Sequence, residues 1–521
     1  MLRKLAVAGF AMLSLGAGAA LAHDKADQLG KVTFPTSCSP KVQALFETGV
    51  AMLHSYWFGE ARKTFDAVLK DDPACAMAYW GIAVDYLGNT LSAPPSSKNA
   101  QAALEALEKG RALGAKTQRE RDWIDALMAY YRDYDKVPVT ERLIAYTKAT
   151  EELTRRYPDD VEARVFYALN LQASASKTDM TYSNQLKSAE ILEKLLTRVP
   201  DHPGVVHFLI HAYDYPPLAD KGIAAARRYA KLAPAAPHAR HMPSHIYSMV
   251  GLWEESIASN LSALEVRKDY HHASDFIVYA QLQLAQDAKA QATFEQAREV
   301  AAGGGTGGLG NTPLAAMPAR LVLERGDWKA AAQLPITTPD SPVAESLTRF
   351  TRGFGMARTG DLAGARAEVE AMQALRTRLE KSDNSYWADR TEEQMLAVSA
   401  WVAFAEGNMD RAEEFMRAAA DREDGSVKHV AMENRLYPMR ELYAELLLEM
   451  GRAAPALREF ETALKAYPNR YRTVFGIARA AEAAGDRRKA ADHYKKLMVL
   501  AKNADSQRPE LARARAYIAL Q

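Results

Sequence analysis

The sequence repeats itself at intervals of 34 residues. Gly451 and Gly485 stand 34 positions apart, and so do Gly326 and Gly360. A period of this length is typical of a unit of two short helices, which buries its apolar face only when a neighbouring unit stacks on it. Alanine, leucine, glutamate, arginine and lysine are abundant, and runs of β-branched residues are scarce, which favours helix. The sequence therefore predicts an all-α stack of helix pairs.

Single units also carry the residues that a helix pair needs where its helices cross. In the stretch 45–73, Gly49 is the small residue of the first helix, and Ala61 and Phe65 lie on the second. Pro73 ends the second helix because proline cannot continue the backbone hydrogen-bond ladder. This pattern resembles the tetratricopeptide repeat family over most of the chain. The resemblance implies a helix-turn-helix solenoid, wound as a right-handed superhelix, in which the first helix of each unit lines a concave groove.

The first 22 residues have the layout of an export signal. Arg3 and Lys4 precede a short apolar stretch, and Ala20-Leu21-Ala22 is a small-residue cleavage site. The apolar stretch is too short to cross a bilayer comfortably, and no later segment approaches a transmembrane helix. We therefore expect a chain with no membrane span, cleaved before His23 and located in a bacterial periplasm or outside the cell.

Glycine-rich sequence divides the remaining chain into two predicted arrays. Residues 1–22 are the signal peptide, and 23–40 form an N-terminal segment. Residues 41–302 are expected to form a first array with a histidine-rich groove, 303–313 a glycine-rich linker, and 314–521 a second array. The formal net charge is only +1, and no block of basic residues occurs, so nucleic acid is not an expected partner. The expected partner is a protein or peptide that binds in the concave groove.

The chain has two cysteines, Cys38 and Cys75. Cys38 precedes the first helix of the first unit, and Cys75 opens the first helix of the next. Both therefore lie at the same end of adjacent helices, and export would permit a disulfide between them. We predict this disulfide, with two unpaired thiols as the alternative.

Two His-x-x-x-His pairs fall one period apart. The first is His207 and His211, and the second is His241 and His245, each 34 positions after its counterpart. An offset of four returns to nearly the same face of a helix, so each pair points one way. Stacked units place equivalent positions side by side, with packed helix axes about 8–10 Å apart. We therefore expect the four imidazoles to converge on one surface.

Further polar residues share the expected concave face. If Gly251 takes the fifteenth position of its unit, as the family resemblance implies, Asp214 falls on this face beside the first histidine pair. Five more side chains are then expected to line a ligand-binding groove. They are His54, His238, His272, Asp275 and Tyr279.

Imidazole and carboxylate ligands suit a divalent transition metal such as zinc, copper or iron. The predicted ligands are the two histidine pairs and Asp214, and three or four of them would leave one position open for water or substrate. The alternative is a hydrogen-bonded packing network with no metal and no other cofactor. Because the histidine pairs recur at the same position in successive units, they are expected to share one role. That role could be metal binding, or it could be packing.

Three segments support a narrower resemblance. They are 75–81, 117–127 and 241–247, the last reading His-Met-Pro-Ser-His-Ile-Tyr. They resemble a group of exported bacterial tetratricopeptide repeat proteins. In that group a stretch like 207–214, usually with Glu in place of Asp214, precedes the His-Met-Pro-Ser-His segment. The resemblance implies that the histidine cluster is a group feature, and it implies no particular reaction.

Three functions are compatible with these patterns. The first is an exported solenoid that binds a partner or ligand in its groove and holds a metal site in its central repeats. The second is a metal-dependent enzyme, a hydrolase or oxidoreductase, in which Asp214 or a free histidine moves protons. The third is a metal-free scaffold for protein–protein interaction.

Overall fold

The computed structural model describes residues 28–304, 311–382, 384–428 and 435–521. The predicted signal peptide lies outside these residues, as does most of the predicted glycine-rich linker. Within them the chain forms helices and turns, with no strand. The prediction of an all-α fold is therefore confirmed. None of the described helices combines the length and the hydropathy that crossing a bilayer requires.

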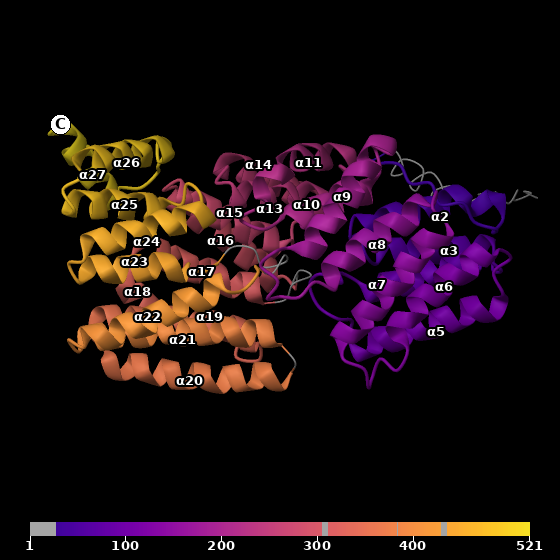
Figure 1. Cartoon of the computed structure of the whole chain (residues 1–521), viewed down its shortest axis with the longest axis horizontal. Coiled ribbons are helices and arrows are strands. Elements are labelled where there is room, and N and C mark those ends of the chain that lie inside the picture. Colours follow the sequence, from indigo (N-terminus) through magenta and orange to yellow (C-terminus); the bar gives the residue numbers. More distant parts are fainter. Residues whose placement is uncertain (1–27, 305–310, 383, 429–434) are drawn as a thin grey trace, which may run out of the picture.

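The N-terminal helices form the indigo and violet part of Figure 1. Successive helices are joined by turns or loops and pack against one another, which is the helix-turn-helix arrangement that the period predicted. Their bounds are η1 (Pro40–Val42), α2 (Gln43–His54), α3 (Glu60–Asp71), α4 (Ala76–Leu87), α5 (Ser97–Leu113), α6 (Gln118–Tyr131), α7 (Val139–Arg156), α8 (Val161–Ala173) and α9 (Ser183–Arg198).

The central helices carry all the histidines predicted as metal ligands. One expected helix is divided here, because Pro243 has no N–H with which to continue the ladder, so that one short helix ends at His241 and the next begins at Pro243. The bounds are α10 (Pro203–Tyr213), α11 (Ala219–Leu232), α12 (Pro237–His241), α13 (Pro243–Met249), α14 (Trp253–Val266), α15 (His271–Gln283) and α16 (Asp287–Ala302).

The C-terminal helices complete the solenoid. They are α17 (Thr312–Arg325), α18 (Trp328–Ala332), α19 (Pro342–Thr359), α20 (Leu362–Lys381), α21 (Ser385–Ala405), α22 (Met409–Asp424), α23 (Met439–Glu449), α24 (Ala453–Ala466), α25 (Tyr471–Ala483), α26 (Arg487–Leu500) and α27 (Pro509–Ala519). The recurrent glycines Gly451 and Gly485 lie in the turns between paired helices, with φ of 77° and 83°. This left-handed conformation explains their period, since glycine adopts it without strain.

Aromatic side chains pack against small residues both within a unit and between neighbouring units. Phe65 on α3 fills the space between Gly49 and Gly81. A Cβ atom at Gly49 would lie 2.8 Å from the Phe65 ring, and one at Gly81 would lie 2.5 Å from it. Phe460 meets Gly476 in the same way in the C-terminal half. The contact between Gly49 and Phe65 is the crossing that the sequence pattern predicted, whereas those at Gly81 and Gly476 were not predicted.

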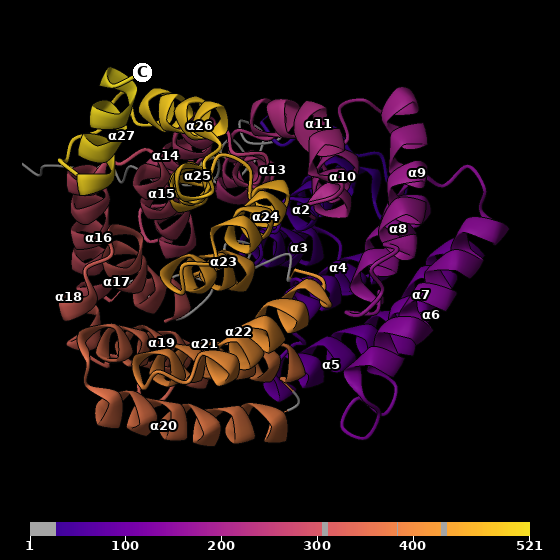
Figure 2. The same cartoon turned by 60° about the vertical axis from the view of Figure 1, so that its left-hand side comes forward.

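The C-terminal helices turn back onto the central ones. Both views place α25 beside α15 (Figures 1 and 2). The Trp253 indole N–H donates to the carbonyl of Asn469 at 2.9 Å, and the Asn469 amide donates to the carbonyl of Gly251 at 3.3 Å. A buried apolar cluster also crosses the predicted linker, joining Val278 and Leu282 to Met317 and Leu321. The two predicted arrays therefore pack against each other directly.

Candidate metal centre

Six histidines of the central helices form two groups of three. His207 and His211 on α10 meet His238 on α12, and we call these three the first triad. His241 on α12, His245 on α13 and His272 on α15 form the second triad. In each triad, one ring nitrogen from every histidine lies within 4.8 Å of the other two.

The second triad is the first one moved along by one repeat. Each of its histidines stands 34 positions after its counterpart, so that His272 corresponds to His238 as the two pairs correspond to each other. The third ligand of each triad thus comes from the unit that follows the pair. Sequence reasoning placed His238 and His272 in the groove, and the structure places them among the predicted ligands.

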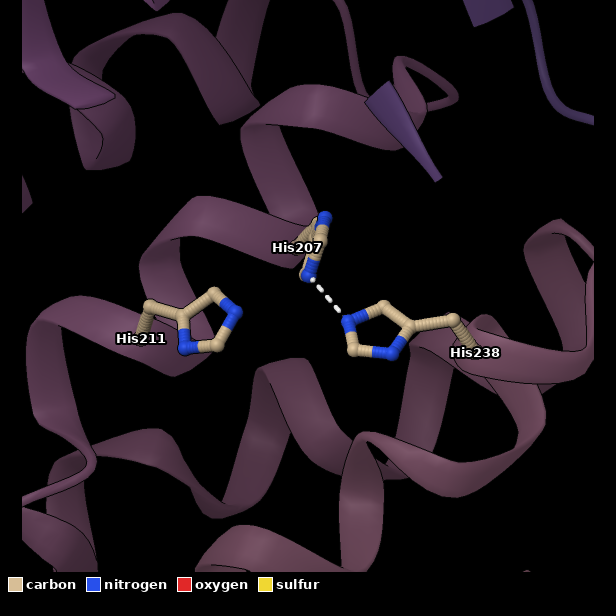
Figure 3. A group of neighbouring side chains, drawn as sticks. All are labelled: His207, His211 and His238. Carbon is tan, nitrogen blue, oxygen red and sulfur yellow. Dashed lines mark hydrogen bonds between the residues drawn. The ribbon is translucent and has the colours of Figure 1, made fainter. Parts of the chain in front are cut away.

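The inner nitrogens face one another closely. Nε2 of His207 lies 3.1 Å from Nε2 of His238, and one nitrogen of His211 faces the same space (Figure 3). In the second triad, Nε2 of His241 lies 3.0 Å from Nε2 of His245. Two nitrogens that each lie about 2.0–2.1 Å from a shared ion would be this far apart at an angle of roughly 95–100°.

The outer nitrogens are held by fixed partners. Nδ1 of His241 lies 2.6 Å from Oδ1 of Asn260, whose own amide donates to the carbonyl of Ser256, so the oxygen must accept. Nδ1 of His245 lies 2.8 Å from a carboxylate oxygen of Asp214. Both Nδ1 atoms therefore donate. Since a neutral imidazole has one N–H, both Nε2 atoms carry lone pairs.

These lone pairs at His241 and His245 point at each other with no hydrogen between them. Two acceptors 3.0 Å apart repel each other unless a positive charge lies between them. Metal-ligating imidazoles have this arrangement, in which Nδ1–H donates outward and Nε2 faces the ion. At His207, Nδ1 likewise donates to the carbonyl of His54 at 2.6 Å. At His238, Nδ1 meets the hydroxyl of Tyr270 at 3.0 Å, which can accept or donate.

His211 carries a second sign of a bound ion. Its side chain is buried, and neither ring nitrogen has a hydrogen-bond partner among the described residues. Leaving a buried polar group without a partner costs about 1–3 kcal/mol. A metal ion in the first triad would give one of these nitrogens a partner.

Burial keeps these imidazoles neutral. It lowers the pKa of His207 to about 3 and that of His241 to about 4. Burial also lowers the pKa of His211, His238 and His245, and the neighbouring histidines lower it further. At neutral pH the lone pairs are therefore available to a cation.

Asp214 lies behind the second triad instead of inside a triad. One of its oxygens accepts from His245, and the other lies 2.5 Å from Nζ of Lys428. All three side chains are buried. Burial raises the pKa of Asp214, and the Lys428 ammonium opposes this rise. The carboxylate thus orients His245, and Lys428 ties the site to the C-terminal half.

The other residues predicted to line an open groove are buried. Asp275 accepts two hydrogen bonds from the guanidinium of Arg320, at 2.8 and 3.2 Å. Tyr279 accepts from Arg470 at 3.3 Å. Both guanidinium groups come from the C-terminal half, so residues of that half pack against Asp275 and Tyr279.

His54 belongs to a separate buried group. Its Nε2 lies 2.7 Å from one oxygen of Glu162, and Nε2 of His202 lies 2.7 Å from the other. Nδ1 of His202 accepts from the N–H of Val205 and caps α10. This group supports the first triad, because the carbonyl of His54 holds His207.

The two cysteines form a disulfide in the structure. Cys38 lies in the segment before η1, and Cys75 is the N-cap of α4. The bridge therefore joins the N-terminal segment to the second repeat.

Sequence reasoning missed the residues behind the ligands. Asn260, Tyr270, Lys428, Glu162 and His202 all contact the histidine cluster or its supports. None of them recurs at the 34-residue period, so no repeat signal marked them.

No protein-family model matches the chain, and no curated protein matches it. Among solved structures, the chain is similar to the human IFIT1 dimer with m7Gppp-AAAA, at 13% identity over 78% of this chain and 87% of that one, with a TM-score of 0.36. It is also similar to the APC/C hetero-tetramer Cut9-Hcn1, at 11% identity over 93% of this chain and 78% of that one, with a TM-score of 0.34.

Proposed function

We propose that this protein is a metal-binding helical solenoid whose central repeats hold two transition-metal ions, one in each triad. The observation that carries the proposal is the pair of facing Nε2 lone pairs at His241 and His245. The first triad repeats the same residues one period earlier, and the unpartnered ring of His211 supports an ion there as well.

The ligand set favours particular metals. All six ligands are neutral imidazoles, and Asp214 lies outside both triads. Imidazole suits zinc and copper, whereas non-haem iron sites of the facial-triad type include a carboxylate. Three protein ligands also leave a fourth position open at each ion, which is the arrangement of catalytic metal sites. This supports a metal-dependent enzyme as the second candidate function.

The proposal places the protein outside the cytoplasm. The sequence begins with the layout of an export signal, and a disulfide between its two cysteines fits an oxidising compartment. A peptide in the concave face is not part of the proposal, because Lys428 and Arg470 of the C-terminal half contact Asp214 and Tyr279, two of the residues predicted on that face.

Metal analysis of the purified full chain tests the proposal. After titration with Zn²⁺ or Cu²⁺ and removal of loose ions, we expect two ions per chain. His211→Ala and His245→Ala should each lose one ion, and the double variant should lose both. His493→Ala is the matched control, because His493 lies on α26 far along the chain, where it meets the carbonyl of Lys489.

Two outcomes would reject the proposal. One is a wild-type chain that stays metal-free after titration. The other is metal that is retained in the double variant or lost equally in the His493 control. Circular dichroism of each variant separates loss of metal from loss of fold.

A further inference from the structure

The two triads form one continuous cluster of imidazoles. The ring centres of His211 and His245, which belong to different triads, are 5.9 Å apart, and those of His238 and His241 are also 5.9 Å apart. Within the first triad, the rings of His211 and His238 are 6.3 Å apart. Rings of different triads are thus as close as the most distant pair within each triad, 6.3 Å in the first and 6.0 Å in the second. Ions in the two triads would be neighbours with no helix between them.

The charge of the site selects a metal ion of low charge. The proposed ligands are neutral, and Asp214, the carboxylate that contacts them among the described residues, is already paired with Lys428. Two divalent ions would bring four positive charges into a buried site, so they would need hydroxide or another anion from solution bound with them to offset that charge. Two Cu⁺ ions would bring only two. Imidazole is an accepted copper ligand, and copper is also the strongest binder in its series as Cu²⁺.

Access to the cluster selects a small substrate. Five of the six histidines are at most 5% exposed, and only His238 is partly exposed. A substrate that reaches rings buried to this degree must itself be small. A diatomic molecule needs little space.

We propose that the paired triads bind two Cu⁺ ions and that this copper pair binds dioxygen between them. This inference rests on the proposed function, and it names the metal and the substrate of that same site. In the step, each Cu⁺ gives up one electron and becomes Cu²⁺. The dioxygen molecule takes both electrons, its O–O bond order falls from two to one, and it binds as a peroxide dianion.

The step needs no proton and no other reactant. The charge of the centre is +2 before and after it, because the dianion offsets the two electrons lost by copper. A buried site favours a reaction that leaves its net charge unchanged, because no new charge must be stabilised away from water. The burial that disfavours two bare divalent ions thus permits the oxidised pair with its bound dianion.

The experiment uses the full chain, freed of metal and loaded anaerobically with two equivalents of Cu⁺. On admitting oxygen, we expect uptake of one O₂ per pair of copper ions and a new absorption band from charge transfer between peroxide and copper. We expect almost no Cu²⁺ signal in electron paramagnetic resonance, because the spins of the bridged ions pair. His245→Ala, which keeps the first triad, should take up no O₂ as a pair and should show an ordinary signal from a single Cu²⁺ after oxidation.

The outcomes separate the two proposals. The dioxygen inference is contradicted if the chain holds two copper ions that remain Cu⁺ in air or give the full signal of two isolated Cu²⁺ ions. In that case the metal site of the proposed function still holds. A chain that binds neither copper nor zinc removes both. Zn²⁺-loaded protein is the control for absorption, and it should show no band with oxygen.

Discussion

At the scale of single residues, the outward partners of the histidines determine which nitrogen faces the proposed ion. Asn260 is the clearest case, because its amide donates to the carbonyl of Ser256 and its oxygen must therefore accept from His241. Partners of this kind fix the tautomer and the orientation of a metal-ligating imidazole. The second triad thus depends on a residue that touches no metal.

Replacing Asn260 should therefore weaken metal binding at the second triad. For Asn260→Leu we expect about 10- to 100-fold lower affinity for one of the two ions, the range found when such partners are removed. Competition with a chromophoric chelator measures the affinity. Ser259→Ala is the matched control, since the Ser259 hydroxyl donates to the carbonyl of Arg240 instead. Equal affinities in the two variants would contradict the role given to Asn260.

Glu120 gives a pH-dependent contribution to stability. The carboxylate is buried and accepts from the N–H and hydroxyl of Ser37 as well as from Thr117. Burial by itself would raise the pKa of Glu120, but these hydrogen bonds outweigh it and hold the pKa below its usual 4.5. A lowered pKa in the folded state means that the stabilisation is present above pH 4.5 and is lost as the pH falls through the folded-state pKa.

Glu120→Gln should therefore lower the free energy of unfolding at pH 7, by about 1–3 kcal/mol. The difference from wild type should shrink as the pH falls below 4.5. Urea unfolding at a series of pH values measures both effects. Glu108→Gln, at an exposed position on α5, should change neither. A difference that grows on acidification would have the wrong sign for this account.

At the scale of helices, the crossings tolerate no added volume. A Cβ atom at Gly476 on α25 would lie 2.3 Å from the ring of Phe460 on α24, well inside van der Waals contact. The two helices would have to move apart, or the ring would have to leave its position. Because neighbouring repeats bury each other's apolar faces, the substitution should also destabilise the repeats next to the one that carries it.

Gly476→Ala should therefore destabilise the C-terminal half by about 1–3 kcal/mol, even though alanine favours helix more than glycine does. Thermal unfolding followed by circular dichroism should show a lower midpoint. Gly303→Ala is the control, because its added Cβ would meet nothing closer than a carbonyl oxygen at 3.4 Å. A midpoint for Gly476→Ala at or above that of the control would refute the steric argument.

At the scale of the whole molecule, buried ion pairs hold the C-terminal half against the centre. Arg470 is fully buried, with Glu324 of α17 at 2.6 Å and Glu441 of α23 at 2.8 Å. Its guanidinium also donates to Tyr279 of α15. Four segments distant in sequence therefore meet at one cation.

Arg470→Met would leave two buried carboxylates without their cation. Removing one partner of a buried ion pair costs about 3–5 kcal/mol. We expect a lower unfolding midpoint and faster limited proteolysis between the two halves. Arg479→Met tests the surface equivalent, a pair with Glu449 at 3.8 Å and partly exposed, and should cost at most about 1 kcal/mol. Similar losses in both variants would show that the buried contact does not hold the halves together.

The sequence by itself determined the helical repeat and the chemistry of the central units. A period of 34 residues sets which side chains are equivalent, and an offset of four places His207 with His211 and His241 with His245. Both are local rules that depend on the chain's immediate neighbours. The stacking of units then follows, because each unit must cover its apolar face.

The tertiary structure alone decided how the six histidines divide and what surrounds them. His238 joins the pair before it and His272 the next, while Asp214 stays outside and faces Lys428. Arg320 and Arg470 pair with Asp275 and Tyr279, two of the residues expected to line the groove. These contacts join residues far apart in the chain and follow no period. They depend on the curvature of the solenoid, which brings its C-terminal helices against its central ones.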